Sequence, residues 1–221
     1  MSDDPKVSLI PDSEVSQTDN FINFKLILAG DSGVGKSSIL KRAVQNKFDE
    51  NYQATIGFEF LLMHFLVNEL KIKLQIWDTC GQETYRSLIQ GFYRNTSLAL
   101  VVYDINKAKT YESLESWLKD IREHTQKDLP IFVIGNKIDL QRMVSFEDAK
   151  IFTTSNRVKK FTECSAKTGR NVKDIFIDAA KFLYSEYKSL QKQNKLPASS
   201  GKLKINSDKN DGINNKKRKC C

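Results

Sequence analysis

The sequence lacks several features that would place the protein in a membrane or in the secretory pathway. It contains no run of about 18 apolar residues, which a membrane-spanning helix needs, and its first 20 residues contain no basic segment followed by an apolar stretch. Its four cysteines include the last two residues and do not have the spacing of a disulfide framework. We therefore expect a protein of a reducing compartment, the cytosol.

Basic residues are unevenly distributed along the chain. The net charge of +8 raises the question of nucleic-acid binding. Residues 1–20, however, contain one Lys against five Asp or Glu, whereas residues 188–221 contain ten Lys or Arg against two Asp. These tails carry −4 and +8, which leaves only +4 for residues 21–187. We therefore expect no nucleic-acid partner.

Composition divides the chain into three parts. Residues 1–20 are acidic and polar and contain two prolines, so we expect a flexible extension. Residues 21–190 contain the apolar runs that a folded domain needs. Residues 191–221 are rich in Lys, Asn and Ser and end in Cys-Cys, which predicts a disordered basic tail.

Strand and helix patterns alternate through residues 21–190. Short apolar runs such as FKLILA, SLALVVYD and PIFVIGN are separated by segments with helical periodicity, while FEFLLMHFLV and KIKLQIWD predict a hairpin. Parallel strands need long crossovers, which the helical segments supply. We predict an α/β fold in which a mostly parallel, six-stranded sheet with one antiparallel strand carries helices on both faces.

A phosphate-binding loop is predicted at residues 30–37. The string GDSGVGKS fits the Walker A pattern and lies between a predicted strand and a predicted helix, as the motif requires. The four specified positions would occur by chance in roughly 1% of chains this long. Glycines let the backbone amides face a polyphosphate, Lys36 can reach the terminal phosphates, and Ser37 can bind Mg²⁺. The alternative is a glycine turn with a surface lysine.

A phosphate loop alone does not distinguish adenylate kinases, ATPases and GTPases, because all three classes have one. The residues that bind the base must decide between them. The strand PIFVIG ends in Asn136, Lys137, Ile138 and Asp139, at the edge where ligands bind in open α/β sheets. Guanine presents two adjacent donors that a carboxylate can accept, whereas adenine presents an acceptor there. Asp139 therefore predicts guanine binding, although these four residues alone would also fit a polar turn.

A carboxylate for magnesium and a glutamine for hydrolysis follow the strand KLQIWD. Asp78 can hold Mg²⁺ through water, the Gly81 amide can contact the γ-phosphate, and Gln82 can orient the attacking water. The sequence does not identify an intrinsic arginine finger, and Arg86 reads as a solvated surface charge. We therefore expect slow hydrolysis of GTP that a partner protein accelerates.

Thr55 lies in an aperiodic segment after the first predicted helix. Its hydroxyl could reach Mg²⁺ and the γ-phosphate only when this loop is ordered. Hydrolysis would remove those contacts and release both this loop and residues 79–93. The sequence thus predicts a switch, although Thr55 alone would read as an ordinary loop residue.

The motifs GDSGVGKSS, TIGFEF, WDTCGQE, NKID and CSAK together resemble the Ras superfamily of small GTPases. The strings IGFEF, KLQIWDTCGQE and YRSLIQGFYRN and the terminal Cys-Cys resemble its Rab family, which implies a phosphate-loop GTPase fold and control of vesicle traffic. The resemblance also places Phe48 on the guanine, although Phe48 would equally fit the end of an amphipathic helix. The nucleotide contacts that it implies are Ser32, Gly33, Val34, Gly35, Lys36, Ser37, Ser38, Phe48, Thr55, Gly81, Asn136, Lys137, Asp139, Ser165, Ala166 and Lys167.

The resemblance further implies partners and a membrane anchor. The partners are an exchange factor, a GTPase-activating protein, a dissociation inhibitor, a prenylation escort and effectors that bind the GTP form of a monomer. Cys220 and Cys221 would each receive a geranylgeranyl group, and the basic run at residues 216–219 would add attraction to an anionic leaflet. We expect the protein in the cytosol and on the cytoplasmic face of endomembranes, and WLKDIREH is similar to Rabs of the early secretory pathway.

One residue departs from the family pattern, and two other functions stay open. Cys80 stands where the family commonly has Ala, and burial would make its thiol inert. The main alternative is a GTP-binding module with negligible hydrolysis that acts as a membrane-recruited scaffold, although Gln82 argues against it. A phosphate-loop kinase is disfavoured because Asp139 and residues 79–93 fit guanine sensing and no acceptor domain is evident.

Overall fold

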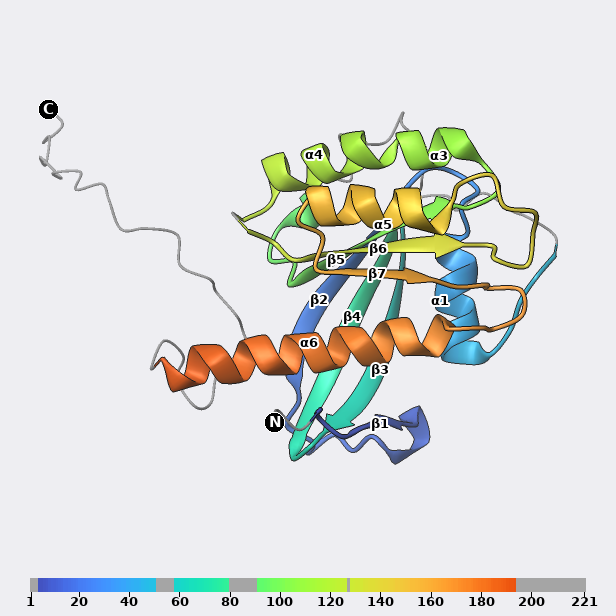
Figure 1. Ribbon diagram of the computed structural model, residues 1–221. Helices are drawn as coiled ribbons and strands as arrows, with labels where there is room; N and C mark the ends of the chain where they lie inside the picture. Colours follow the sequence, from blue (N-terminus) through green and yellow to red (C-terminus); the bar gives the residue numbers. More distant parts are fainter. Residues whose placement is uncertain (1–3, 51–57, 80–90, 127, 194–221) are drawn as a thin grey trace, which may run out of the picture.

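One sheet runs through the whole folded part of the chain, in the order β1-β3-β4-β2-β5-β6-β7 (Figure 1). The computed structural model describes residues 4–50, 58–79, 91–126 and 128–193. The elements are β1 (Val7–Ile10), η1 (Asp12–Glu14), β2 (Ile22–Ala29), α1 (Lys36–Gln45), β3 (Phe58–Val67), β4 (Leu70–Thr79), η3 (Gly91–Tyr93), β5 (Leu98–Asp104), α3 (Ala108–Glu112), α4 (Leu114–His124), β6 (Ile131–Asn136), α5 (Phe146–Ser155), β7 (Lys160–Glu163) and α6 (Val172–Lys192).

The strand β3 is the one that runs against its neighbours. It pairs antiparallel with β4 over its whole length, and the predicted hairpin turns at Asn68, whose φ is +50°. The pairs β2–β4, β2–β5, β5–β6 and β6–β7 are all parallel. The prediction of a mostly parallel sheet with one antiparallel strand is therefore confirmed.

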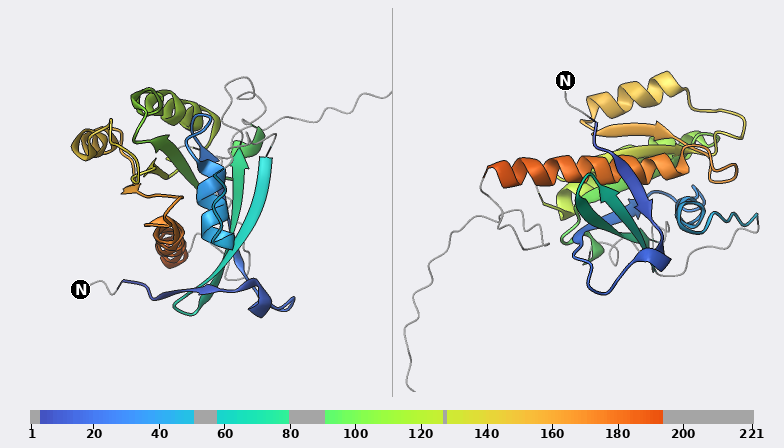
Figure 2. Two further views of the ribbon diagram at one scale, coloured as in Figure 1. Left: turned by 90° about the vertical axis from the view of Figure 1, so that its right-hand side faces the viewer. Right: turned by 90° about the horizontal axis from the view of Figure 1, so that it is seen from below.

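Helices cover both faces of the sheet, as the alternation of strands and helices predicted (Figures 1 and 2). Successive residues of β2 point to opposite faces, as in any strand. Leu26 and Leu28 pack with α1 and α6, whereas Ile27 and Ala29 pack with α4 and α5. The strands β5 and β6 are buried throughout, because helices cover them on both sides.

The parallel strands bring their carboxyl ends to one edge of the sheet. The strands β2, β4, β5 and β6 end there at Ala29, Thr79, Asp104 and Asn136. Ligands of open α/β sheets bind at this edge. The sequence motifs predicted to bind nucleotide follow directly after these strand ends.

The N-terminal segment differs from its prediction. We expected residues 1–20 to be flexible, but residues 7–10 form β1, which pairs antiparallel with residues 64–67 of β3 and gives the sheet a seventh strand. Val7 packs against the core, and the main chain of Lys6 exchanges hydrogen bonds with Asn68.

The acidic side chains of this segment contact basic side chains of the domain. Asp19 pairs with Lys71 of β4 at 2.5 Å, and Asp4 pairs with Lys181 of α6. Asp12 lies 3.1 Å from the ring of His64 on β3. The acidic residues that predicted a flexible extension thus pair with basic residues of the domain. Composition alone does not show this pairing.

No helix within the described ranges is long and apolar enough to cross a membrane. The last described residue is 193, so the tail predicted at residues 191–221 lies almost entirely outside the described ranges. Its order and its role therefore stay predictions.

Candidate nucleotide-binding site

The predicted phosphate loop connects β2 to α1. It leaves β2 at Gly30, whose φ of +134° is a conformation that residues with a side chain rarely adopt. A Cβ at this position would lie 2.2 Å from the carbonyl oxygen of Val102 in β5. The loop then reaches Gly35, the residue that caps the N-terminus of α1. Its backbone therefore curls in front of a helix N-terminus, where anions are stabilised.

Lys36 occupies the inside of this loop. Its side chain is only 6% exposed, and its ammonium donates hydrogen bonds to the carbonyl oxygens of Gly30 at 2.8 Å and Asp31 at 2.9 Å. A cation held within a curl of backbone can meet the terminal phosphates of a nucleotide. The structure thus places Lys36 inside the loop predicted to bind phosphate, and its phosphate contact stays a prediction.

Asp78 and Ser37, which the sequence predicts to hold Mg²⁺, lie side by side. The Ser37 hydroxyl donates a hydrogen bond to Oδ2 of Asp78, while Oδ1 is buried and has no hydrogen-bond partner within the described part of the chain. Burial raises the pKa of Asp78 to about 6. A buried carboxylate oxygen without a partner beside a hydroxyl suits Mg²⁺, which prefers oxygen ligands and would offset the cost of burying the charge.

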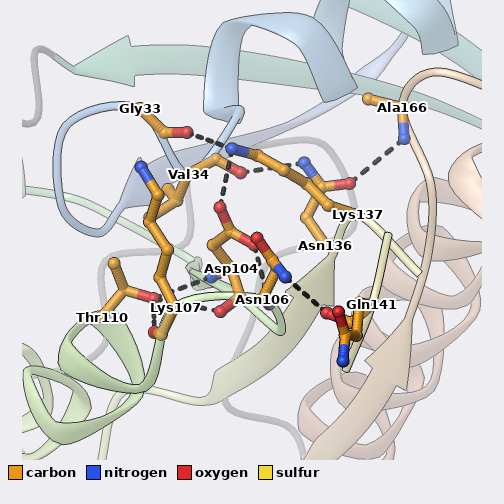
Figure 3. A network of polar contacts seen from close by, with 10 residues as sticks. All are labelled: Gly33, Val34, Asp104, Asn106, Lys107, Thr110, Asn136, Lys137, Gln141 and Ala166. Atoms are coloured by element: carbon orange, nitrogen blue, oxygen red, sulfur yellow. Dashed lines mark hydrogen bonds and ion pairs between the residues drawn. The ribbon is translucent and has the colours of Figure 1, made fainter. Parts of the chain in front are cut away.

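Asn136 connects the phosphate side of the site to the base side. Its Nδ2 donates to the carbonyl oxygen of Val34 in the phosphate loop at 2.9 Å. Its Oδ1 accepts from the backbone amide of Ala166 at 3.1 Å (Figure 3). One side chain at the end of β6 therefore holds together two loops that are distant in sequence.

Lys137 reaches back across the phosphate loop. Its ammonium donates to the carbonyl oxygen of Gly33 at 2.7 Å and forms an ion pair with Asp104 at 2.7 Å (Figure 3). Asp104 lies at the end of β5 and is 1% exposed, so this ion pair is shielded from water on one side. Sequence reasoning missed Asp104, although the strand SLALVVYD ends in this carboxylate just as KLQIWD ends in Asp78.

Asp139 and Ser165 provide the candidate base-recognition group. Asp139 is exposed, and Ser165 orients it by donating a hydrogen bond to Oδ1 at 2.5 Å. The neighbouring Cys164 is buried, and burial raises the pKa of its thiol to about 12. Cys164 is therefore an unreactive packing residue next to a solvent-accessible carboxylate.

Phe48 and Lys167 lie on two segments next to α1, whose Arg42 donates a hydrogen bond to the Lys167 carbonyl oxygen. Phe48 is half-buried and packs against the core beside α1, so packing accounts for part of its position. The ammonium of Lys167 lies 3.1 Å from Glu50. Both predicted base contacts thus belong to the wall that residues 46–50 and 165–167 form. The other predicted contacts, Ser32, Val34, Gly35 and Ser38, lie in the loop and the first turn of α1.

Several predicted residues fall outside the described ranges. They are Thr55, Cys80, Gly81, Gln82, Arg86, Cys220 and Cys221. The structure therefore describes the residues predicted to bind phosphate, magnesium and base, whereas the hydrolytic, switching and lipidation residues lie outside the described ranges. The roles of both groups stay predictions.

Comparisons with known proteins agree with this geometry. The Ras family model matches residues 25–185. The chain is 42% identical over 202 residues to the Ras-related protein Rab11B of Nicotiana tabacum, which covers 90% of this chain and 93% of that protein. It is 44% identical over 155 residues to the GTP-binding protein ypt3 of Schizosaccharomyces pombe, covering 69% and 72%. It is 43% identical over 163 residues to the Ras-related protein rab-11.1 of Caenorhabditis elegans, covering 73% and 77%.

Proposed function

Because this chain belongs to the Rab family of small GTPases, which regulate vesicle trafficking, we propose that it binds GTP with Mg²⁺, hydrolyses it slowly and changes partners with the bound nucleotide. One observation carries most of the proposal. Asn136 bonds both the phosphate loop and the 165–167 loop, so phosphate-binding and base-binding residues converge on a single site.

In this proposal the phosphate end stabilises charge and does little covalent chemistry. Lys36 and the helix N-terminus hold the phosphates, and Ser37 with Asp78 holds Mg²⁺, which supplies positive charge beside the phosphate oxygens. Gln82 orients the attacking water. A GTPase-activating protein adds the charge or the ordering that makes hydrolysis fast.

The base end selects guanine. Asp139 accepts hydrogen bonds from N1–H and the 2-amino group of guanine, while adenine would present an acceptor to it. Ser165 keeps the carboxylate oriented through its 2.5 Å hydrogen bond. Phe48 and the stem of Lys137 lie along the two faces of the base.

The switching part consists of residues around Thr55 and residues 79–93. Contacts from Thr55 to Mg²⁺ and from Gly81 to the γ-phosphate order these segments in the GTP form, and hydrolysis releases them. Exchange factor, dissociation inhibitor and effectors each recognise one of the two forms.

The tail attaches the protein to endomembranes. Geranylgeranyl groups on Cys220 and Cys221 give the two chains that stable anchoring needs, and each charge of the 216–219 run adds about 1 kcal/mol of attraction to an anionic leaflet. A prenylation escort delivers the protein, and similarity to Rab11-type proteins supports an endomembrane location.

Single-turnover hydrolysis of bound GTP tests the proposal. Wild type, Gln82→Leu and Asp139→Asn are compared, with GTP and ATP binding measured in parallel. Slow phosphate release that Gln82→Leu suppresses, together with a GTP preference that Asp139→Asn weakens, is the expected result. Asp128→Asn is the matched control, because Asp128 is exposed, has a φ of +66° and belongs to the α4–β6 connection.

Other outcomes would assign a different function. GTP binding without any phosphate release would favour a GTP-binding scaffold. Equal binding of ATP would overturn the role of Asp139.

A further inference from the structure

Arg42 of α1 contacts both loops that form the base wall. Its Nε donates to the carbonyl oxygen of Ala166 at 2.9 Å, and its Nη2 donates to that of Lys167 at 2.7 Å. On the other side of the guanidinium, Nη1 donates to the carbonyl oxygen of Asn46 at 2.9 Å. One side chain therefore bridges residues 46 and 166–167, which are 120 positions apart in the sequence.

The same guanidinium also lies over the ring of Phe48. Its central carbon is 5.9 Å from the ring centroid, within the range of a cation–π contact. Phe48 is half-buried, so the ring is held between the core and this cation. Arg42 thus touches the aromatic group proposed to stack on guanine and the loop proposed to meet the edge of the base.

Arg42 holds the 165–167 loop on the side that faces α1. Among the described residues, the carbonyl oxygens of Ala166 and Lys167 accept hydrogen bonds only from Arg42. On the inner side the Ala166 amide donates to Asn136. The loop is therefore held from both sides, by Asn136 toward the phosphate loop and by Arg42 toward α1.

We propose that Arg42 is a positioning residue for the guanine base, which fixes the spacing between Phe48 and the 165–167 loop before nucleotide binds. The inference rests on the proposed function of this site. A loop that is already ordered loses less conformational entropy when ligand binds, so preorganisation strengthens binding without a direct contact. Arg42 itself need not touch the nucleotide.

A lysine could not replace this arrangement. The planar guanidinium directs several N–H groups at fixed angles, and here they reach three carbonyl oxygens on two segments while the flat face meets an aromatic ring. The ammonium of a lysine keeps the positive charge but lacks the N–H groups that the guanidinium directs at fixed angles. Arg42→Lys therefore separates the geometry of Arg42 from its charge.

The test measures the rate at which bound GDP dissociates from wild type, Arg42→Lys and Arg42→Gln at fixed Mg²⁺. Losing two loop hydrogen bonds should accelerate release by about 10-fold or more in both variants. Arg122→Lys is the matched control, because Arg122 also donates from a helix to a loop carbonyl, that of Asn156, but belongs to α4. Its GDP release should stay at the wild-type rate.

A second readout separates base positioning from a general loss of structure. EDTA removes Mg²⁺ and speeds GDP release through the phosphate end of the site. If Arg42 acts on the base wall, the acceleration by EDTA is the same factor in Arg42→Lys as in wild type. The proposal would be overturned if Arg42→Lys released GDP at the wild-type rate, or if EDTA accelerated its GDP release by a smaller factor than in wild type. Failure of wild type to bind GDP would instead refute the proposed function.

Discussion

Replacing Gly30 by alanine tests how closely the phosphate loop is built against β5. The added Cβ would lie 2.2 Å from the carbonyl oxygen of Val102, and this atom belongs to the backbone of a buried strand and cannot swing aside. The φ of +134° adds backbone strain of about 1–3 kcal/mol. Displacing packed backbone adds about 1–3 kcal/mol more. We therefore expect Gly30→Ala to lower the free energy of unfolding by about 2–6 kcal/mol.

Gly33→Ala in the same loop is the matched control. Its φ of +77° is also positive, but a Cβ there would have no atom within 4 Å. Gly33→Ala should therefore lower the free energy of unfolding only through backbone strain at positive φ, by about 1–2 kcal/mol. The two variants thus share the substitution and the loop and differ in the clash.

Urea unfolding at several GDP concentrations gives the two free energies. Extrapolating them to zero GDP removes the contribution of nucleotide binding, which stabilises the folded state by mass action. A difference of less than about 1 kcal/mol between Gly30→Ala and Gly33→Ala would refute the argument, because the strain at positive φ alone would then explain both.

Four further predictions concern the N-terminal segment, Cys164 and Asp78. Deleting residues 1–20 removes β1 and the burial of Val7, so the free energy of unfolding in urea should fall by about 2–4 kcal/mol; an unchanged midpoint would show that β1 contributes nothing. Because the pKa of Cys164 is raised to about 12, iodoacetamide at pH 8 should leave its peptide unmodified in the folded protein and alkylate it in denaturant, as read by mass spectrometry. The pKa of Asp78 is raised to about 6 and Mg²⁺ needs the anion, so the Mg²⁺ affinity measured through GDP release should fall about tenfold from pH 7 to pH 5, and Asp78→Asn should weaken this dependence. Without Mg²⁺ the sign reverses for stability: the folded state binds the proton of Asp78 more tightly than the unfolded state, so the contribution of Asp78 to the free energy of unfolding, read as the difference between wild type and Asp78→Asn, should rise as the pH falls from 7 toward 4.

The sequence predicted the residues whose role follows from a strand end or a glycine loop. Lys36, Asp78 and Asn136 follow apolar runs that became β2, β4 and β6, and the parallel sheet brought them together. Asp104 carries the same signal at the end of β5 and was missed because no nucleotide contact was expected there. A rule that inspects every strand end would have found it.

Two other features depend on contacts that no local pattern contains. The residues VSLI became β1 only because β3 offers an open edge about 60 positions later in the chain, next to basic side chains that neutralise the acidic segment. Arg42 occupies an ordinary position of an amphipathic helix, and its importance comes from carbonyl oxygens of residues 166 and 167. Side chains that act through distant backbone atoms leave no periodicity or motif in the sequence.

The pairing of Asp4 with α6 also affects how the protein can be labelled for microscopy. The proposed lipid attachment needs a free C-terminus, so a fluorescent protein would be fused to the N-terminus. Asp4 and Pro5, however, line a groove together with Tyr184, Lys188 and Lys192 in the last turns of α6. A fusion joined directly to the N-terminus thus places a bulky domain next to the end of α6, where the proposed anchor segment follows. A spacer of ten residues, spanning up to about 35 Å, would move the fluorescent domain clear of it.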